Sequence, residues 1–389
     1  MNMLKIVHCV IDDKFIDSMI SIMDSVSDSC EHDFVIVSES TKINYVYLKK
    51  IDRVKIVLPE VFIRYLDERA ANVVVIHGLF SLNLDLLLKI KSKIKVVWLA
   101  WGYDIYESIF NYRALIRNCE LYHIRTLLVK KMEYLSHPVK VLYDLKHCLD
   151  KSLMEEAVGR VDYFSGVIPE EYDMIKSNPQ NSFFKAKRLD FSYINLDSYY
   201  TKEHLNDSFV EGMNIQIGNS GDETNNHLDL FYLLHKYDLG NKKIFVPLSY
   251  SGGKHYKSVV CWYGRRLWKE NFIPIMSFMP LNDYNNLIAS TQYALFFHER
   301  QQAMGNIYNA LWNGSMVFLS QESPAYCYLK KNGYVIYTIQ NDLYRVGNCE
   351  TLSYDERMNN RIKMLKFYSP EACLNKTKKI IDILTNDFY

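Results

Sequence analysis

The feature that most constrains the fold is a repeated alternation of short β-branched runs with segments whose apolar residues have helical spacing. Runs such as 73–76 and 95–99 are continuously apolar, as in central parallel strands that are buried on both faces. The alternation therefore predicts parallel sheets covered by helices. The first series of expected strands is 4–10, 34–37, 55–58, 73–76, 95–99, 161–165 and 186–193, with a helix at 14–26.

A second series of the same kind begins after a polar stretch, 196–212, that has no period and suits a linker. At 389 residues, the chain has room for two domains. We expect an α/β domain at 1–200, a second at 213–350, and a C-terminal helical segment at 351–389. The expected strands of the second series are 214–217, 243–247, 273–276, 293–297, 316–319 and 334–337, followed by helices at 355–367 and 370–384.

Charge and cysteine usage exclude several classes of protein. The chain has 46 basic and 45 acidic residues, so it lacks the basic excess of a dedicated nucleic-acid binder. Its eight cysteines show no metal-binding spacing and are typical of reduced thiols in a cytoplasmic protein. The first residues lack the pattern of a signal peptide, and the longest charge-free stretch, 301–321, is too polar for hydrocarbon. We therefore expect a cytoplasmic protein.

Ligands of open α/β sheets bind beyond the carboxyl ends of the strands, and a glycine-containing polar loop follows the expected strand 214–217. Glycine lets several backbone N–H groups point at one anion, and the next helix start adds partial positive charge. The loop suits a diphosphate; alternatively it is a plain junction in which Asp222 or Thr224 caps the helix. The residues expected to contact a ligand here are Asn219, Ser220, Gly221, Asp222, Asn225 and His227.

A second polar run follows the expected strand 293–297 and opens a helix at 307–312. Arg300 can form a bidentate charge-assisted pair with phosphate oxygens. The neighbouring glutamines suit a ribose or sugar, and Gly305 allows a ligand to approach the helix. The alternative is a polar helix start with Arg300 in a structural ion pair. The ligand contacts expected from this run are Arg300, Gln301, Gln302, Gly305 and Asn306.

Titratable side chains stand at the corresponding strand ends of the N-terminal half. His77 follows the expected strand 73–76, and Asp104 comes after 95–99. Either can take a proton from an acceptor hydroxyl, with Asp104 the preferred general base and His77 the second. Asp13, after the first strand, is a weaker third candidate. The alternatives are a structural histidine and an Asp104 that caps a helix.

Other catalytic motifs are missing from the sequence. There is no G-x-G-x-x-G, no complete P-loop and no G-x-S-x-G. A D-x-D pair that would hold a metal under a nucleotide diphosphate is also missing. We therefore expect neither a metal nor a cofactor, and a leaving diphosphate would be neutralised by Arg300, backbone N–H groups and helix dipoles.

The segment 111–148 is rich in Lys and Arg with apolar residues between them. Such a segment can rest on an anionic membrane surface. The ordinary alternative is a solvated helix face.

The loops resemble those of the TDP-N-acetylfucosamine:lipid II N-acetylfucosaminyltransferases of enterobacterial common antigen assembly, glycosyltransferase family 56. The Gly-Asn-Ser-Gly-Asp and Arg-Gln-Gln motifs are the specific ones, while His298-Glu299 departs from the family's smaller or apolar residues. The matching stretches are His77-Gly78-x-Phe80, Trp101-Gly102-x-Asp104-x-Tyr106-Glu107, Gly218-Asn219-Ser220-Gly221-Asp222-x-x-Asn225-x-His227, Val246-Pro247 with Tyr250, and Arg300-Gln301-Gln302-x-x-Gly305.

The resemblance implies a GT-B fold, with two Rossmann-like domains whose parallel sheets face an interdomain cleft. It implies a dTDP-linked deoxyamino sugar such as dTDP-Fuc4NAc as donor, Tyr250 as a further donor contact, and a polyprenyl-diphosphate-linked glycan as acceptor at the inner membrane face. The alternatives are a UDP- or GDP-sugar transferase for capsule, O-antigen or protein glycan, a nucleotide-sugar epimerase or hydrolase of the same architecture, and a non-catalytic scaffold.

Overall fold

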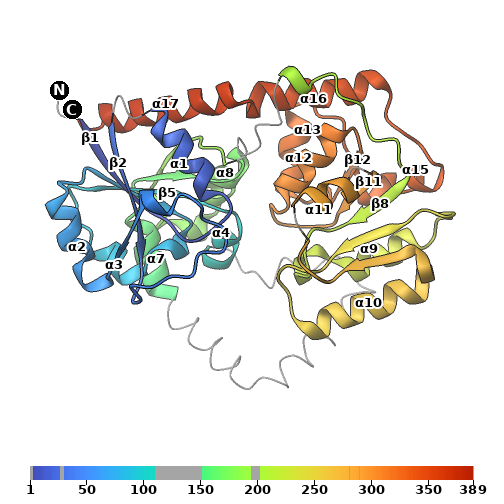
Figure 1. The fold of residues 1–389 in the computed structure, drawn as a ribbon, viewed down its shortest axis with the longest axis horizontal. Helices are drawn as coiled ribbons and strands as arrows, with labels where there is room; N and C mark the ends of the chain where they lie inside the picture. The colour runs from blue at the N-terminus through green and yellow to red at the C-terminus, as the bar shows by residue number, and fades with distance from the viewer. Residues whose placement is uncertain are drawn as a thin grey trace. The chain divides into compact units, whose positions relative to one another are not determined.

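The computed structural model describes residues 3–26, 30–109, 151–193, 202–279, 281–288 and 290–388. The described residues form two compact units (Figure 1). Unit 1 contains those up to 109, those of 151–193, and those from 367 onward; unit 2 contains 202–366. The basic segment 111–148, expected as a membrane-surface candidate, lies outside the described residues.

Unit 1 is built on a seven-stranded sheet of order β3-β2-β1-β4-β5-β6-β7. Every neighbouring pair is parallel. All five residues of β4 are buried, as expected for a central strand covered on both faces. The strands are β1 (Leu4–Cys9), β2 (Cys30–Val37), β3 (Val54–Val57), β4 (Val73–His77), β5 (Lys95–Leu99), β6 (Tyr163–Ser165) and β7 (Lys187–Arg188).

The expected strand at 186–193 is much shorter in the structure, where β7 spans two residues. Beyond β7 the chain leaves the sheet because the Ser165 hydroxyl, and not a neighbouring strand, accepts the backbone N–H of Phe191 at 2.9 Å. Leu189 and Phe191 then pack into the apolar core. The apolar spacing that predicted a strand here therefore reflects side chains that are buried in the core beyond the end of β7.

Helices lie on both sides of the unit 1 sheet (Figure 1). The apolar core on one face joins β1, β2, β4 and β5 to helices α1 (Ile16–Asp24) and α17 (Pro370–Asn386). Ile380, Ile381 and Leu384 of α17 belong to this core, although they are among the last residues of the chain. The other helices of unit 1 are α2 (Pro59–Glu68), α3 (Leu84–Lys89), α4 (Tyr103–Ser108), α7 (Lys151–Gly159) and α8 (Pro169–Ser177).

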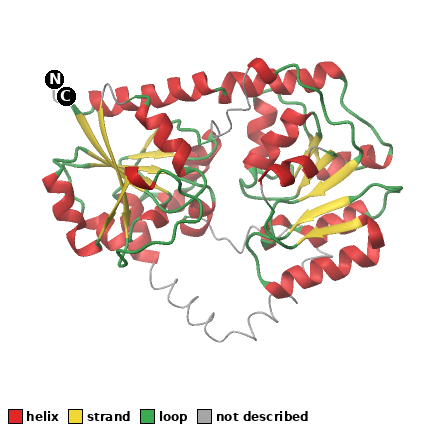
Figure 2. Ribbon diagram, viewed as in Figure 1, coloured by secondary structure: helices red, strands yellow, loops and turns green. Residues whose placement is uncertain are grey.

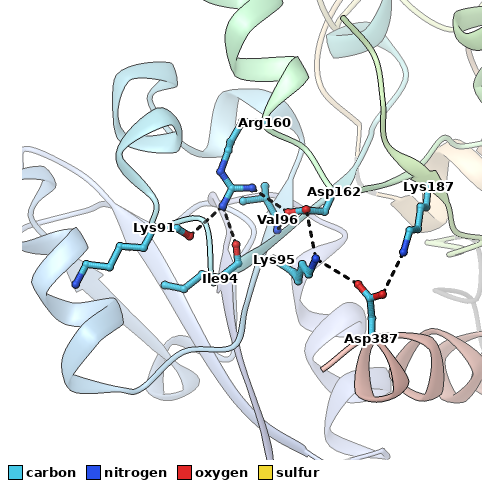
Figure 3. Close-up of polar contacts among 8 residues, drawn as sticks. All are labelled: Lys91, Ile94, Lys95, Val96, Arg160, Asp162, Lys187 and Asp387. Carbon is cyan, nitrogen blue, oxygen red and sulfur yellow. Dashed lines mark hydrogen bonds and ion pairs between the residues drawn. The ribbon is translucent and has the colours of Figure 1, made fainter. Parts of the chain in front are cut away.

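An ion-pair network fastens the end of α17 to the amino-terminal ends of the strands (Figure 3). Asp387 lies 3.4 Å from Lys95 Nζ and 3.1 Å from Lys187 Nζ. Lys95 also lies 3.8 Å from Asp162, which pairs with Arg160 at 2.9 Å. Hydrogen bonds from Tyr163 and Lys187 lower the pKa of Asp387 to about 2. The last helix is thus held by both apolar and charged contacts.

Unit 2 contains a six-stranded sheet of order β10-β9-β8-β11-β12-β13, again parallel throughout. The expected strand at 334–337 is displaced: β13 pairs only at Tyr337–Thr338, because Tyr334 and Ile336 are buried ahead of the ladder. The other strands are β8 (Asn214–Ile217), β9 (Ile244–Pro247), β10 (Phe272–Ile275), β11 (Thr291–Phe296) and β12 (Met316–Leu319).

Helices flank this second sheet as well (Figure 2). In the described part of the chain, no helix combines the length and apolar character needed to cross a bilayer. The helices of unit 2 are α9 (His227–Leu234), α10 (Lys254–Trp268), α11 (Leu281–Ile288), α12 (Met304–Asn313), α13 (Pro324–Lys331), α14 (Ile339–Asp342), α15 (Tyr344–Gly347) and α16 (Tyr354–Tyr368).

Candidate active site

The loop after β8 is folded tightly around one asparagine. Asn225 Oδ1 accepts the backbone N–H of Asn219 at 2.9 Å, and Asn225 Nδ2 donates to Ser220 Oγ at 3.1 Å. Gly218 has a φ of 67°, and a Cβ there would stand 2.6 Å from Asn225 Oδ1. Glycine is required at this position both for the backbone conformation and for the close approach. The loop predicted from sequence is therefore a defined structure held by its own side chains.

Hydrogen bonds connect this loop to the polar run after β11. Thr224 Oγ1 lies 2.7 Å from Gln302 Oε1 and accepts from Arg300 Nε at 3.3 Å. Gln302 Nε2 donates to Asn219 Oδ1 at 3.1 Å. β8 and β11 are neighbours in the sheet, so their carboxyl ends bring the two expected ligand-binding runs together. Arg300 is only 7% exposed, and its guanidinium is held against the Thr224 hydroxyl of the loop.

The amino-terminal end of α12 has the features of an anion site. Its N-cap, Ala303, has a φ of 62° and supplies no side-chain hydrogen bond to the first N–H groups of this ten-residue helix. A Cβ built on Gly305 would meet nothing within 4 Å. Orphan N–H groups beside open space, with the helix dipole behind them, suit a diphosphate. Asn306 lies in the same turn and accepts from Tyr284 Oη at 2.7 Å.

Tyr250 and Lys257 also contact the loop after β8. Tyr250 was expected from the sequence, and Lys257 was not. Gly221 donates its N–H to the backbone oxygen of Tyr250 at 2.7 Å, and the Tyr250 side chain is 71% exposed. A Cβ on Gly221 would lie 2.3 Å from Cε of Lys257, so the Lys257 chain crosses directly over this glycine. Lys257 follows two glycines in an exposed helix start, and its position over another loop depends on tertiary packing.

Two histidines are buried beneath the loop. His298 Nε2 lies 2.9 Å from Asn225 Oδ1, and His227 Nδ1 lies 3.1 Å from the Tyr256 hydroxyl. Burial lowers the pKa of His227 to about 3, and burial with the nearby Arg300 charge lowers the pKa of His298 well below its usual value. Both rings are therefore neutral near pH 7. They support the loop without adding charge.

In unit 1, the three proton acceptors expected from the sequence lie around Tyr193. They are His77, Asp104 and Asp13. The Tyr193 hydroxyl is 2.5 Å from His77 Nδ1. Burial raises the pKa of Tyr193 well above its usual value, and the charges of Asp104 and Asp13 add to the effect. Tyr193 follows the short edge strand and carries no motif, so sequence reasoning did not identify it.

Asp104 is buried and its carboxylate binds its own unit. One oxygen accepts from the Leu79 N–H at 3.0 Å and Trp98 Nε1 at 2.8 Å, and the other accepts from the Trp101 N–H at 2.9 Å. Burial raises the pKa of Asp104, and these hydrogen bonds oppose the shift. The carboxylate joins the loops that follow β4 and β5. The alternative that Asp104 caps a helix is wrong, because the N-cap of α4 is Gly102 and Asp104 lies within the first turn.

Asp13 is more exposed than Asp104. One of its oxygens accepts the Phe15 N–H at 3.0 Å ahead of α1, and burial raises its pKa. The adjacent Asp12 has a structural use, because it accepts backbone N–H groups of Val46, Tyr47 and Leu48.

Aromatic side chains stand beside these groups at the same end of the sheet. The rings of Phe80 and Tyr103 stack at 5.0 Å, and Trp101 contacts Phe80 edge-on at 5.3 Å. Phe80 and Tyr103 are each 37% exposed. Exposed aromatic faces beside titratable groups suit a ligand with both apolar and hydroxyl-bearing surfaces.

Comparison with known proteins agrees with this architecture. The model of the family described as 4-alpha-L-fucosyltransferase, glycosyl transferase group 56, matches residues 179–348, a little under half of the chain. The motifs from Gly218 to Gly305 lie inside this range; those at 77–80 and 101–107 lie outside it.

Solved structures match over nearly the whole length. A glycosyltransferase from Rickettsia africae has 12% identity and a TM-score of 0.63, and the match covers 99% of each chain. A lipopolysaccharide outer core galactosyltransferase has 11% identity and a TM-score of 0.61, covering 98% of this chain and 99% of that one. A trehalose 6-phosphate synthase from Burkholderia multivorans has 8% identity and a TM-score of 0.59, covering 100% and 98%. The chain is therefore a glycosyltransferase with the GT-B fold, and its residues 179–348 match the fucosyltransferase family that its motifs resemble.

Proposed function

We propose that the chain transfers a deoxyamino or deoxy hexose from a nucleotide diphosphate sugar, with dTDP-Fuc4NAc as the first donor to test. The acceptor in this proposal is a polyprenyl-diphosphate-linked glycan of a bacterial surface polysaccharide. The enzyme would work on the cytoplasmic side, with the basic segment 111–148 resting on the inner membrane surface. The reaction needs one site for a diphosphate and another for a proton.

The observation that carries the proposal is the loop and helix end in unit 2. Arg300 and Gln302 are hydrogen-bonded to Thr224 of the loop after β8. The uncapped start of α12, with open space at Gly305, follows them directly in the sequence. When the sugar–oxygen bond breaks, the diphosphate gains negative charge, and preorganised N–H groups and a guanidinium stabilise that charge. Lys257 is placed to add a second cation over Gly221.

Unit 1 supports the acceptor half of the proposal. His77, Tyr193 and Asp13 are candidates to receive the acceptor's proton, directly or through one another. Asp104, whose two oxygens already accept three hydrogen bonds, is assigned to hold the surrounding loops. This reverses the order favoured by the sequence, where Asp104 ranked first. Phe80 and Tyr103 would contact sugar or prenyl carbons.

A thermal-shift series with dTDP, UDP and GDP tests the donor half. A nucleotide that binds only the folded chain raises its stability, by about 2.7 kcal/mol at a hundred times the Kd. We expect dTDP to give the largest shift. A larger shift with UDP or GDP would change the donor, and no shift with any nucleotide would favour a non-catalytic scaffold.

Product analysis with dTDP-sugar alone tests the reaction. A transferase leaves the donor largely intact until an acceptor is added, whereas an epimerase or hydrolase converts it without one. Conversion at the same rate with and without a lipid-linked acceptor would contradict transfer.

A further inference from the structure

Five side chains of unit 1 form one continuous line of polar contacts across the sheet. Tyr193 Oη lies 2.5 Å from His77 Nδ1, and His77 Nε2 lies 3.0 Å from His8 Nδ1. His8 Nε2 lies 2.9 Å from His32 Nδ1, and His32 Nε2 lies 3.0 Å from Cys30 Sγ. Each histidine uses its two ring nitrogens for two different partners.

The sheet register creates this line from residues far apart in sequence. β1 lies between β2 and β4, and the register partners of His8 are Phe34 and Val75. His32 and His77 each lie two residues from one of these partners, on the same face of the sheet. Side-chain alternation puts His8 on the same face as Ile6 and Val10 of the apolar core. His8 is 1% exposed, His77 is fully buried, and the His8 ring stacks on Phe34 at 4.8 Å.

The contacts restrict where the protons can be. Burial is the main cause that lowers the pKa of all three histidines, of His32 to about 4 and of His77 to about 3. Each ring is then neutral near pH 7 and carries one N–H and one bare nitrogen. Only two arrangements satisfy every contact: all donors point toward Cys30, or all point toward Tyr193. The two differ by the passage of one proton along the line.

The two ends of the line have different surroundings. At one end, Tyr193 lies near Asp13 and Trp101, beside the carboxyl ends of the strands. At the other end, Cys30 and His32 line a surface pocket of about 340 Å³, together with Asp24 and Arg53. This row of five side chains therefore joins Tyr193, beside the candidate proton acceptors, to the surface pocket at Cys30 and His32.

We propose that Tyr193, His77, His8 and His32 form a proton-transfer chain that carries the acceptor's proton from the candidate active site to the surface pocket at His32. The inference rests on the proposed transfer reaction, and it adds Tyr193 as the entry group and His32 as the exit group. It also explains why a row of polar side chains, with His8 and His77 buried at its centre, crosses an otherwise apolar face.

The proton balance of the transfer is complete. The acceptor O–H bond breaks as its oxygen bonds to the anomeric carbon, and the sugar–phosphate bond breaks with its electron pair on the nucleotide diphosphate. The acceptor's proton goes to the Tyr193 oxygen while the Tyr193 proton goes to His77 Nδ1. His77 Nε2 then gives its proton to His8 Nδ1, and His8 Nε2 gives its proton to His32 Nδ1. The His32 Nε2 proton, which points at Cys30 Sγ, is released to the solvent of the pocket that both residues line.

Two substitutions of His32 in the full chain test the proposal. His32→Gln keeps one donor and one acceptor but cannot exchange them, and His32→Ala leaves a space beside the pocket. Removal of general acid–base function typically costs about a hundredfold or more, so we expect kcat to fall at least about tenfold in both variants. The thermal shift with the donor nucleotide should stay at the wild-type value. The control Glu31→Ala, in the same pocket and outside the row, should keep wild-type kcat.

Added imidazole distinguishes proton transfer from structural support. Imidazole should restore kcat in His32→Ala, whereas N-methylimidazole, which has only one nitrogen able to bind a proton, should not. Wild-type kcat in both variants, or equal rescue by the two compounds, would overturn the proposal. Wild-type enzyme that binds nucleotide but transfers no sugar to any acceptor would instead contradict the proposed function on which it rests.

Discussion

The two units share one topology but carry different chemistry at equivalent strand ends. β1, β2, β4 and β5 of unit 1 occupy the same places in strand order as β8, β9, β11 and β12 of unit 2. After β8 the chain places glycines, amides and hydroxyls, and after β1 it places Asp12 and Asp13 without a glycine. In the proposed reaction, unit 2 therefore approaches an anion with its backbone, and unit 1 binds and moves a proton.

The largest expected effect is a loss of kcat without a loss of donor affinity, which would separate proton transfer from donor binding. We expect His77→Gln to lower kcat by about 10²- to 10⁴-fold, the usual contribution of a general base. Donor affinity should not change, because His77 belongs to unit 1 and the proposed nucleotide-binding groups belong to unit 2. Steady-state kinetics with a titration of the donor nucleotide measure both. A matched loss in Asp104→Asn, without loss of stability, would restore Asp104 as the base.

Arg300→Ala should have the next largest effect and act through unit 2. A hydrogen bond to a charged group contributes about 1.5–3 kcal/mol, so the Kd for the nucleotide diphosphate should rise about 10- to 100-fold. Calorimetric titration measures this change. Arg266→Ala, which removes an exposed cation of the same unit, is the control and should bind like the wild type. Unchanged affinity in Arg300→Ala would remove Arg300 from the donor site.

Two glycine substitutions should have opposite consequences within unit 2. Gly252 has a φ of 76°, and a Cβ there would lie 1.7 Å from the Gly221 oxygen, so Gly252→Ala should destabilise the loop. Gly305→Ala meets no atom within 4 Å and should keep or slightly raise the melting temperature, since alanine favours a helix by up to about 1 kcal/mol. Its methyl group would occupy the space assigned to phosphate, so nucleotide affinity should fall about tenfold, or 1.4 kcal/mol. Wild-type affinity in Gly305→Ala would place the phosphate elsewhere.

The smallest effect concerns stability in acid. Burial lowers the pKa of His77 in unit 1 and of His227 in unit 2 to about 3, while an unfolded histidine titrates near 6.5. Below pH 6.5 the unfolded chain binds protons that the folded chain does not, so stability falls as the pH falls toward 3.

His77→Gln and His227→Gln should each reduce that pH slope by about one proton, or about 1.4 kcal/mol per pH unit. Denaturant titrations between pH 7.5 and 5 measure it. An unchanged slope in either variant would mean that the corresponding ring is protonated in the folded chain.

The fold was largely predictable because burial on both faces leaves a local pattern. The run at 73–76 is continuously apolar and becomes β4, and 214–217 becomes β8 with the same bounds. The pattern failed at 186–193 and at 334–337, where apolar residues are buried outside a strand ladder. Local sequence reports burial more reliably than it reports hydrogen bonding between strands.

The candidate donor site was also largely visible, because its glycines and polar residues follow their strands directly. The histidine row was not visible. His8 stands inside an apolar run and His32 stands between Glu31 and Asp33. Only the register of β1 with β2 and β4 brings them to each other and to His77. Tyr193 and Lys257 were missed for the same reason, since their contacts join segments far apart in the chain.

The position of α17 has a consequence for biosynthesis. Ile380, Ile381 and Leu384 complete the apolar core of unit 1, and Asp387 pairs with Lys95 and Lys187 (Figure 3). The strands of unit 1 are therefore synthesised well before α17, the helix that completes their apolar core. Unit 2, which lies wholly within the intervening sequence, has all its described residues before α17 is made. Unit 1 thus begins to be synthesised before unit 2, but its core is completed after unit 2 has been made.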